Sequence, residues 1–242
     1  MSKFKLPTEV LDLPSKGLLY PKDHPLSSGK VEIKYMTAKE EDILSNSAYI
    51  QKGTVIDKLL ESLLVTKVKL DDFLVGDKNA VMIAARVLGY GKDYTFTYNG
   101  KEETVDLSKL EHVPIDEDKF KNGNEFDYVF PHSKTRITFK LINGADEKKI
   151  QREVEGLQRI NKDADPSLST RLKYIITSVE GDRDAKTIRD FVDNYLLARD
   201  SREFRLYVKA FSPDVDLTFF PLGEEVKRSV PIGLSLFWPD SE

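Results

Sequence analysis

The chain has 242 residues, no cysteine, and 37 basic against 41 acidic residues, which gives a net charge of −4. Without cysteine it can form neither disulfides nor thiolate metal sites. Its basic residues are interspersed with acidic ones, and no apolar run approaches the roughly 20 residues that a membrane span needs. We therefore expect neither a nucleic acid nor a membrane as partner. The length suits one large or two small domains.

An apolar segment without a helix is predicted near the start of the chain. The stretch LPSKGLLYP spans residues 13–21, and each of its prolines lacks an amide hydrogen and pushes the preceding residue toward extended geometry. Its apolar residues Leu18, Leu19 and Tyr20 are unusual for a surface loop. We expect an extended arm over residues 1–30 that docks either on its own domain or on a neighbouring protein.

A strand and two helices are predicted after the arm. Alternating apolar residues predict a strand over residues 30–35. Thr37, with Glu40 three residues later, forms a capping-box pattern, so one helix is predicted from there through residue 50. Residues 53–65 carry an apolar stripe at helical spacing, which predicts a second helix.

A third helix is predicted over residues 77–91, with Asp77 as its cap and a glycine at its end. It is apolar on nearly every side except at Arg86, so we expect it to be the most buried helix of an N-terminal cluster. We expect Arg86 to reach solvent or to pair with a carboxylate of a neighbouring helix.

The pattern then changes to the period of two that is typical of strands, and residues 93–107 predict a hairpin around Asn99-Gly100. A four-residue loop would place Phe96 opposite Val105, whereas a two-residue loop would place it opposite Glu103. We predict the four-residue loop, because it pairs apolar with apolar side chains.

The remaining chain, residues 109–242, is predicted to form a second region that could be one domain with residues 31–108. A polar segment begins it, and Pro213 ends its last helix. The tail is predicted to return to strands with a turn at residues 221–223. The predicted elements between are strands over residues 125–130 and 135–142, and helices over residues 146–159, 168–179, 184–200 and 201–213.

No constellation for catalysis or metal binding is found in the sequence. The three histidines, His24, His112 and His132, are far apart and form no close metal-binding pair. Asp163 and Asp165 resemble the start of a calcium loop, but the glycine and the glutamate that such a loop requires are missing. We predict a protein that is not an enzyme and that has no catalytic residue, metal or cofactor.

Apolar side chains gather in the segment PIGLSLFWP, residues 231–239, as they do in the arm. Exposed clusters of this kind are costly unless the fold or a partner covers them, and aromatic anchors are enriched at interfaces. The candidate partner-binding residues are Leu18, Leu19 and Tyr20 at one end and Leu236, Phe237 and Trp238 at the other. The alternative is that both segments close the protein's own core.

Several motifs, in their order, resemble the baseplate hub proteins of T4-type contractile-tailed phages, namely the hub subunit and hub assembly proteins. The motifs are LPSKGLLYP, GKVEIKYMTAKEEDIL, GTVIDKLL, LVGDKNAVMIAARVLGYG and PIGLSLFWP. The resemblance is densest over residues 13–98, returns near residue 231 and is thin between.

The resemblance implies a role in forming the baseplate hub by binding other hub or tail proteins. The protein would act in the host cytoplasm during assembly, either as a part of the virion baseplate or as a transient assembly chaperone that the mature virion lacks. A homo-oligomer is compatible with both roles. The rival hypotheses are an enzyme with a cryptic site and a nucleic-acid-binding module.

The resemblance also bears on the two hairpins. Related tail proteins carry Cys-Pro-x-Cys-Gly knuckles at the turns of such hairpins, so that two knuckles could share one zinc. Here the corresponding turns, residues 98–101 and 220–223, read YNGK and FPLG and hold no cysteine. The resemblance therefore implies no zinc, and packing must replace the metal if the hairpins pair. The candidates for this packing are Tyr94, Phe96, Tyr98, Phe219 and Phe220.

Together these patterns predict an α+β fold. Two helical clusters, over about residues 37–90 and 145–212, are joined by antiparallel β-hairpins that resemble zinc-knuckle hairpins without their cysteines.

Overall fold

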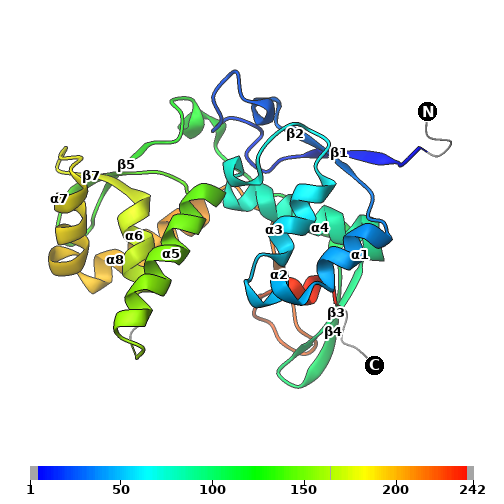
Figure 1. Ribbon diagram of the computed structural model, residues 1–242. Helices are drawn as coiled ribbons and strands as arrows, with labels where there is room; N and C mark the ends of the chain where they lie inside the picture. The colour runs from blue at the N-terminus through cyan, green and yellow to red at the C-terminus, as the bar shows by residue number, and fades with distance from the viewer. Residues whose placement is uncertain (1–4, 164, 239–242) are drawn as a thin grey trace.

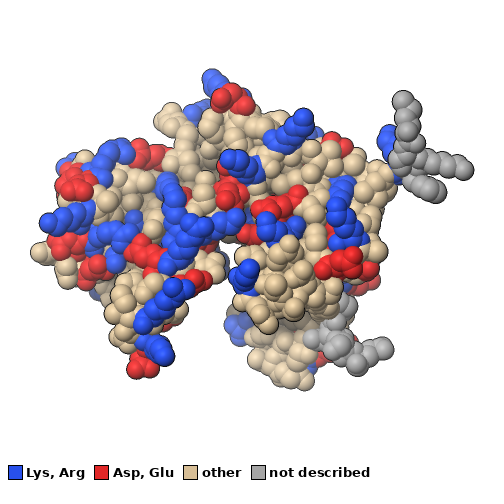
Figure 2. Space-filling model, viewed as in Figure 1, with Lys and Arg blue, Asp and Glu red and all other residues tan. Residues whose placement is uncertain are grey.

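The computed structural model describes residues 5–163 and 165–238. Its helices fall into two groups, with α1–α4 on one side of the molecule and α5–α8 on the other, and the sheets are small and antiparallel (Figure 1). Lysine, arginine, aspartate and glutamate intermingle over the face in Figure 2, where a notch at the lower edge separates the two groups. The predicted α+β class is confirmed.

The first lobe is built around one cluster of buried apolar residues. Its helices are accompanied by strands from both ends of the described chain and by four short 3-10 helices. Its elements are β1 (Thr8–Asp12), η1 (Pro25–Ser28), β2 (Lys30–Lys34), α1 (Ala38–Leu44), α2 (Ser47–Gln51), α3 (Val55–Leu63), η2 (Leu70–Asp72), α4 (Val75–Tyr90), β3 (Asp93–Tyr98), β4 (Lys101–Asp106), η3 (Leu107–Lys109), β8 (Thr218–Phe219), β9 (Arg228–Ser229) and η6 (Leu234–Leu236).

The predicted capping box at Thr37 is present at the start of α1. The Thr37 amide donates a hydrogen bond of 2.9 Å to the Glu40 carboxylate, and Lys34 forms an ion pair with the same carboxylate. Burial would raise the pKa of Glu40, but the hydrogen bonds from Lys34 and Thr37 lower it to about 2. The single helix predicted here is two helices, because the Asn46 side chain caps α2 by accepting from the Ala48 and Tyr49 amides.

Helix α4 begins at Val75, two residues earlier than predicted. Leu74 occupies the N-cap position, so Asp77 is not the cap and instead lies inside the first turn with no exposed surface. The apolar sequence of α4 explains its burial, and Gly91, with φ of 87°, ends it.

The hairpin β3–β4 has the two-residue loop, so the predicted register is wrong. Phe96 lies opposite Glu103, and Tyr94 lies opposite Val105. Asn99 and Gly100 have φ of 49° and 76°, which is the backbone that a tight type I′ turn requires. The turn chemistry therefore decides the register over the apolar pairing.

The second lobe packs helices against a three-stranded sheet in the order β5-β6-β7. The predicted strand pair is confirmed, and the Asp184 side chain caps α7 as predicted by accepting from the Lys186 amide. The elements are η4 (Glu117–Phe120), β5 (Phe126–Val129), β6 (Arg136–Phe139), α5 (Gly144–Ile160), α6 (Ser167–Ile175), β7 (Ile176–Val179), α7 (Ala185–Asp190), a π-helical turn (Phe191–Tyr195) and α8 (Ala198–Phe211).

The helix predicted over residues 168–179 is wrong over its last four residues. Helix α6 stops at Ile175, and the four residues that follow form strand β7. Ile137 of β6 pairs with Val179, and Thr138 pairs with Ser178. The β-branched residues of ITSV favour a strand, and the free edge of β6 supplies its partner.

Aromatic rings from α8 and the sheet form the core of the second lobe. Phe204 packs edge-on against Phe130 and Phe139, with ring centroids 5.6 and 5.3 Å apart, and Phe211 packs against Phe126 at 4.7 Å. Such pairs add to the stability gained from burial alone. The chain then leaves this lobe, because residues from Val215 to Phe237 join the buried cluster of the first lobe. The tail therefore packs with the first lobe, although the sequence analysis placed it in a region, residues 109–242, that could be one domain with residues 31–108.

Two glycines allow close backbone contact where the lobes meet. A Cβ added to Gly76 in α4 would lie 1.9 Å from the Pro213 carbonyl oxygen, and one added to Gly144 at the start of α5 would lie 3.0 Å from Asp71 Cα. The Gly144 amide also donates to the Phe73 carbonyl. These contacts hold the start of α4 against the end of α8, and hold the segment just before α4 against the start of α5.

We predict that Gly76→Ala destabilises the protein, because backbone atoms must move to admit the new methyl group. The expected loss is about 1–3 kcal/mol in the free energy of unfolding, measured by urea denaturation. The matched control is Gly156→Ala in α5, where no atom lies within 4 Å of the added Cβ. Gly156→Ala should stabilise by about 0.5–1 kcal/mol, because alanine favours the helix. Equal effects of the two substitutions would contradict the close contact.

Candidate protein-interaction site

The N-terminal arm docks on its own chain through the buried carboxylate of Asp77. This carboxylate accepts hydrogen bonds from the Ser15 amide at 2.9 Å, the Ser15 hydroxyl at 2.7 Å and the Tyr20 hydroxyl at 2.6 Å. The Tyr20 hydroxyl in turn accepts from the Leu74 amide at 3.0 Å, which satisfies an N-terminal amide of α4. The arm therefore supplies the polar partners that the first turn of α4 needs.

Burial sets the acid–base behaviour of this group of residues. It raises the pKa of Asp77, although hydrogen bonds from Tyr20 and Ser15 act in the opposite direction. Burial and the neighbouring Asp77 charge both raise the pKa of Tyr20, so its hydroxyl remains a donor throughout the physiological range. The arrangement is a structural hydrogen-bond network between the arm and α4.

The three predicted arm residues bury against both lobes. Leu19 is buried in the core of the second lobe, Leu18 packs partly against it, and Tyr20 contacts the cores of both lobes. Of the two alternatives left open by the sequence, the structure places the arm on its own chain. Within the described part of the arm, β1 is extended and pairs with β2, but the segment after it is less extended than predicted, because turns begin at residue 14.

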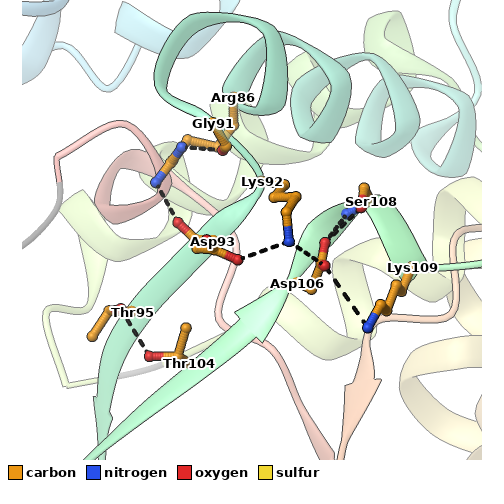
Figure 3. Close-up of polar contacts among 9 residues, drawn as sticks. All are labelled: Arg86, Gly91, Lys92, Asp93, Thr95, Thr104, Asp106, Ser108 and Lys109. Carbon is orange, nitrogen blue, oxygen red and sulfur yellow. Dashed lines mark hydrogen bonds and ion pairs between the residues drawn. The ribbon is translucent and has the colours of Figure 1, made fainter.

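A second candidate site lies where the hairpins β3–β4 and β8–β9 meet. Arg86 holds its root, which is the junction between the end of α4 and the start of β3 (Figure 3). Arg86 is buried, and its guanidinium donates to the Gly91 carbonyl at 2.5 Å and to the Asp93 carbonyl at 3.0 Å. The expectation that Arg86 reaches solvent or pairs with a neighbouring carboxylate is wrong. Its charge instead satisfies the carbonyls at the junction of α4 and β3.

An ion pair joins the two strands at the same root. Lys92 contacts the Asp106 carboxylate at 2.6 Å, and the Thr95 and Thr104 hydroxyls are 2.9 Å apart further along the hairpin (Figure 3). The hydrogen bond from Lys92, followed by that from Ser108, lowers the pKa of Asp106 to about 2. The hairpin is thus tied to the end of α4 by polar contacts at its base.

Aromatic packing holds the two hairpins side by side. The Phe219 ring meets the Phe96 and Tyr98 rings edge-on, with centroids 5.2 and 5.9 Å apart. The Tyr94 hydroxyl lies 3.3 Å from the hydroxyl of Ser235. Four of the five aromatic residues predicted for this packing, Tyr94, Phe96, Tyr98 and Phe219, lie in or against the core of the first lobe.

Leu236 and Phe237 lie in that same core and are 0% and 1% exposed. Because they are buried, Leu236 and Phe237 have almost no surface with which to bind a partner. They follow the alternative in which the segment closes the protein's own core. Trp238 differs, because 40% of its surface is exposed. It is the last described residue of the chain.

Phe220 was predicted to pack between the hairpins with the other four aromatic residues. This prediction is wrong, because the Phe220 side chain is 59% exposed. Alternation along the strand turns Phe219 inward and Phe220 outward. Leu222 and Val226, in the same hairpin, are 78% and 59% exposed. The period of two in the sequence could have separated Phe219 from Phe220, but nothing in it marked the tip as exposed.

A polar contact between the hairpins fixes this apolar tip, which consists of Phe220, Leu222 and Val226. The Glu103 carboxylate accepts a hydrogen bond of 2.9 Å from the Leu222 amide, across 119 residues of sequence. Lys227 lies over the Phe220 ring, with 5.5 Å between its ammonium nitrogen and the centroid. The register that placed Glu103 opposite Phe96 therefore also places it where it can hold the tip.

Each of the three histidines makes its own contact, and His112 pairs with Val215 in an isolated bridge. His24 stacks on the Tyr20 ring at 5.2 Å, and the His132 ring contacts Glu203 at 3.0 Å. Over residues 5–163 and 165–238, no three histidine, aspartate or glutamate side chains are grouped as a metal site. No helix in this part of the chain is long and apolar enough to cross a membrane.

Comparison with known proteins gives no relative: no family model, curated protein or solved structure matches this chain. The resemblance to baseplate hub proteins therefore stays a prediction.

We predict that Tyr20→Phe destabilises the protein by about 1–3 kcal/mol, because the Leu74 amide and the Asp77 carboxylate lose a buried partner. Tyr35→Phe is the matched control, since the Tyr35 hydroxyl makes no hydrogen bond to any described residue and the expected change is near zero. Urea denaturation measures both. A Tyr20→Phe protein as stable as Tyr35→Phe would show that the network does not secure the arm.

Proposed function

We propose that this chain is a non-enzymatic tail protein that takes part in forming the baseplate hub of a contractile-tailed phage through protein–protein contacts. Two things support the proposal. One is the resemblance of its ordered motifs to the hub proteins. The other, which carries the argument from geometry, is the apolar tip held out on the paired hairpins.

The tip is suited to binding a protein because it is both apolar and held in place. Three large apolar side chains within seven residues are more than half exposed. Large apolar side chains that are exposed together in one short loop favour a protein-interaction site. The fixed root, the aromatic packing and the Glu103 contact reduce the ordering cost that a loose loop would incur on binding.

The partners in this proposal are other hub or tail proteins, met in the host cytoplasm during assembly. The arm and residues 236–237 take no direct part, because they stabilise the fold that carries the tip. The protein stays in the virion baseplate in this proposal, and the alternative is a transient chaperone that leaves before the particle is complete.

The experiment replaces the tip residue Leu222 and follows hub formation. Leu222→Asp should reduce the yield of infectious particles at least about tenfold when it complements a phage that lacks the wild-type gene, because a charge enters an apolar interface. Leu206→Asp on α8 is the matched control, since Leu206 is also an exposed leucine, at 59%, but lies in the other lobe. Both variants should unfold at the same urea concentration as the wild type.

A photo-crosslinking amino acid at position 222 identifies the partner in the same cells. We expect a cross-link to a baseplate or tail protein at position 222 and none at position 206. Recovery of the cross-linked product from purified particles supports a virion component, whereas its presence only in immature assemblies supports the chaperone. Normal particle yield with Leu222→Asp, and no cross-link to a tail protein, would overturn the proposal.

A further inference from the structure

A cleft of about 360 Å³ lies where the two lobes meet. The start of α4, with Leu74 to Gly76, forms one wall, and α6 and α8 form the other, with Leu172, Phe204 and Val208 on its floor. Pro213 and Asp214, at the crossing from α8 back to the first lobe, close one end. A cleft of this volume accepts a large side chain.

Basic side chains surround this apolar floor, and two of them are not neutralised. Lys140 and Arg171 form ion pairs with Asp146 and Glu147. Arg205 and Lys209, one helical turn apart on α8, are exposed and form no ion pair with any described residue. Asp214 is directed elsewhere, since it accepts from Asn79 at 3.1 Å and from the Val215 amide at 2.7 Å. The cleft thus combines an apolar floor with two cations that form no ion pair, although Lys209 lies near enough to Asp214 for its charge to oppose the rise in the pKa of Asp214 that burial causes.

We propose that this cleft binds residues 238–242 of a second copy of the chain, with Trp238 over the apolar floor and Asp240 and Glu242 on Arg205 and Lys209. This segment reads WPDSE and so carries a large apolar side chain followed by two carboxylates. Trp238 is 40% exposed, and residues 239–242 lie beyond the described part of the chain. The inference is independent of the proposed hub function.

The spacing of the charges supports this pairing. Bound in an extended form, the segment would present Trp238, Asp240 and Glu242 on one side, because alternate residues of an extended chain share a side and lie about 7 Å apart. Residues four apart on a helix lie about 6 Å apart, so Arg205 and Lys209 present their charges at a matching interval. Each carboxylate can therefore meet one cation.

Such a contact joins two different surfaces of the same chain. It is therefore a head-to-tail contact, which gives rings or open chains of subunits rather than a two-fold dimer. Since the cleft takes residues from both lobes, occupancy should also hold the lobes together.

The test follows self-association of the full chain by sedimentation velocity. The wild type should associate as its concentration rises, and Arg205→Glu/Lys209→Glu should weaken association at least about tenfold, because both attractive pairs become repulsive. Arg199→Glu/Arg202→Glu changes the net charge equally on the same helix. Neither of these arginines lines the cleft or forms an ion pair with a described residue, so this control should associate normally.

Charge exchange then separates the proposed contact from a general effect on the fold. The Asp240→Lys/Glu242→Lys chain should fail to associate with itself. It should bind the Arg205→Glu/Lys209→Glu chain, because the basic segment of the first meets the acidic cleft of the second and the acidic segment of the second meets the basic cleft of the first. A labelled, amidated peptide of residues 234–242 should bind the wild-type chain and bind the Arg205→Glu/Lys209→Glu chain at least about tenfold more weakly. The amide removes any contribution from a terminal carboxylate.

A wild-type chain that stays monomeric at all concentrations and does not bind the peptide would overturn the proposal. Association that survives both sets of charge reversals would overturn it as well, since the contact would then lie elsewhere.

Discussion

The fold depends on one buried carboxylate, that of Asp77 in the first turn of α4. A carboxylate without exposed surface is stable there only if its oxygens are satisfied, and Ser15 and Tyr20 of the arm provide three hydrogen bonds. Dissociation of the arm segment LPSKGLLYP would therefore expose Leu19 and leave the Asp77 carboxylate without its hydrogen-bond donors. This requirement explains how a segment without a helix is held as firmly as the elements around it.

The start of α4 is also where the two lobes meet. Gly76 lies against the Pro213 carbonyl, and Leu74 pairs with Asn143 in an isolated bridge, so the arm, both lobes and the crossing to the tail converge on residues 74–77. At the other end of the same helix, Arg86 holds the root of β3–β4. Helix α4 thus links the junction of the lobes to the paired hairpins, and the apolar tip is presented from a framework that is fixed at both ends.

Local sequence patterns predicted much of the fold, and contacts distant in sequence account for the rest. The capping box at Thr37 and the cap at Asp184 act over three or four residues, and both are confirmed. The strand at Ile176–Val179 forms because β6 offers it an open edge. The role of Asp77 depends on Tyr20 and Ser15, which are separated from it by 57 and 62 positions in the sequence. Neither feature could be predicted from the neighbouring residues alone. The register of β3–β4 could have been predicted from the sequence, because Asn99-Gly100 favours the two-residue turn. The exposed tip could not have been predicted, because only the packing of Phe219 and the Glu103 contact show which residues of the hairpin stay exposed to solvent.

Amide hydrogen exchange at Ser15 and Leu74 tests most directly whether the arm is an integral part of the fold. Both amides donate to the Asp77 network, one to the carboxylate and one to the Tyr20 hydroxyl. The account predicts that both amides exchange as slowly as the Phe139 amide in the central strand of the second lobe. Exchange at all three positions should then require opening of the folded protein. Exchange at Ser15 and Leu74 near the rate of an unfolded chain, while Phe139 stays protected, would contradict it.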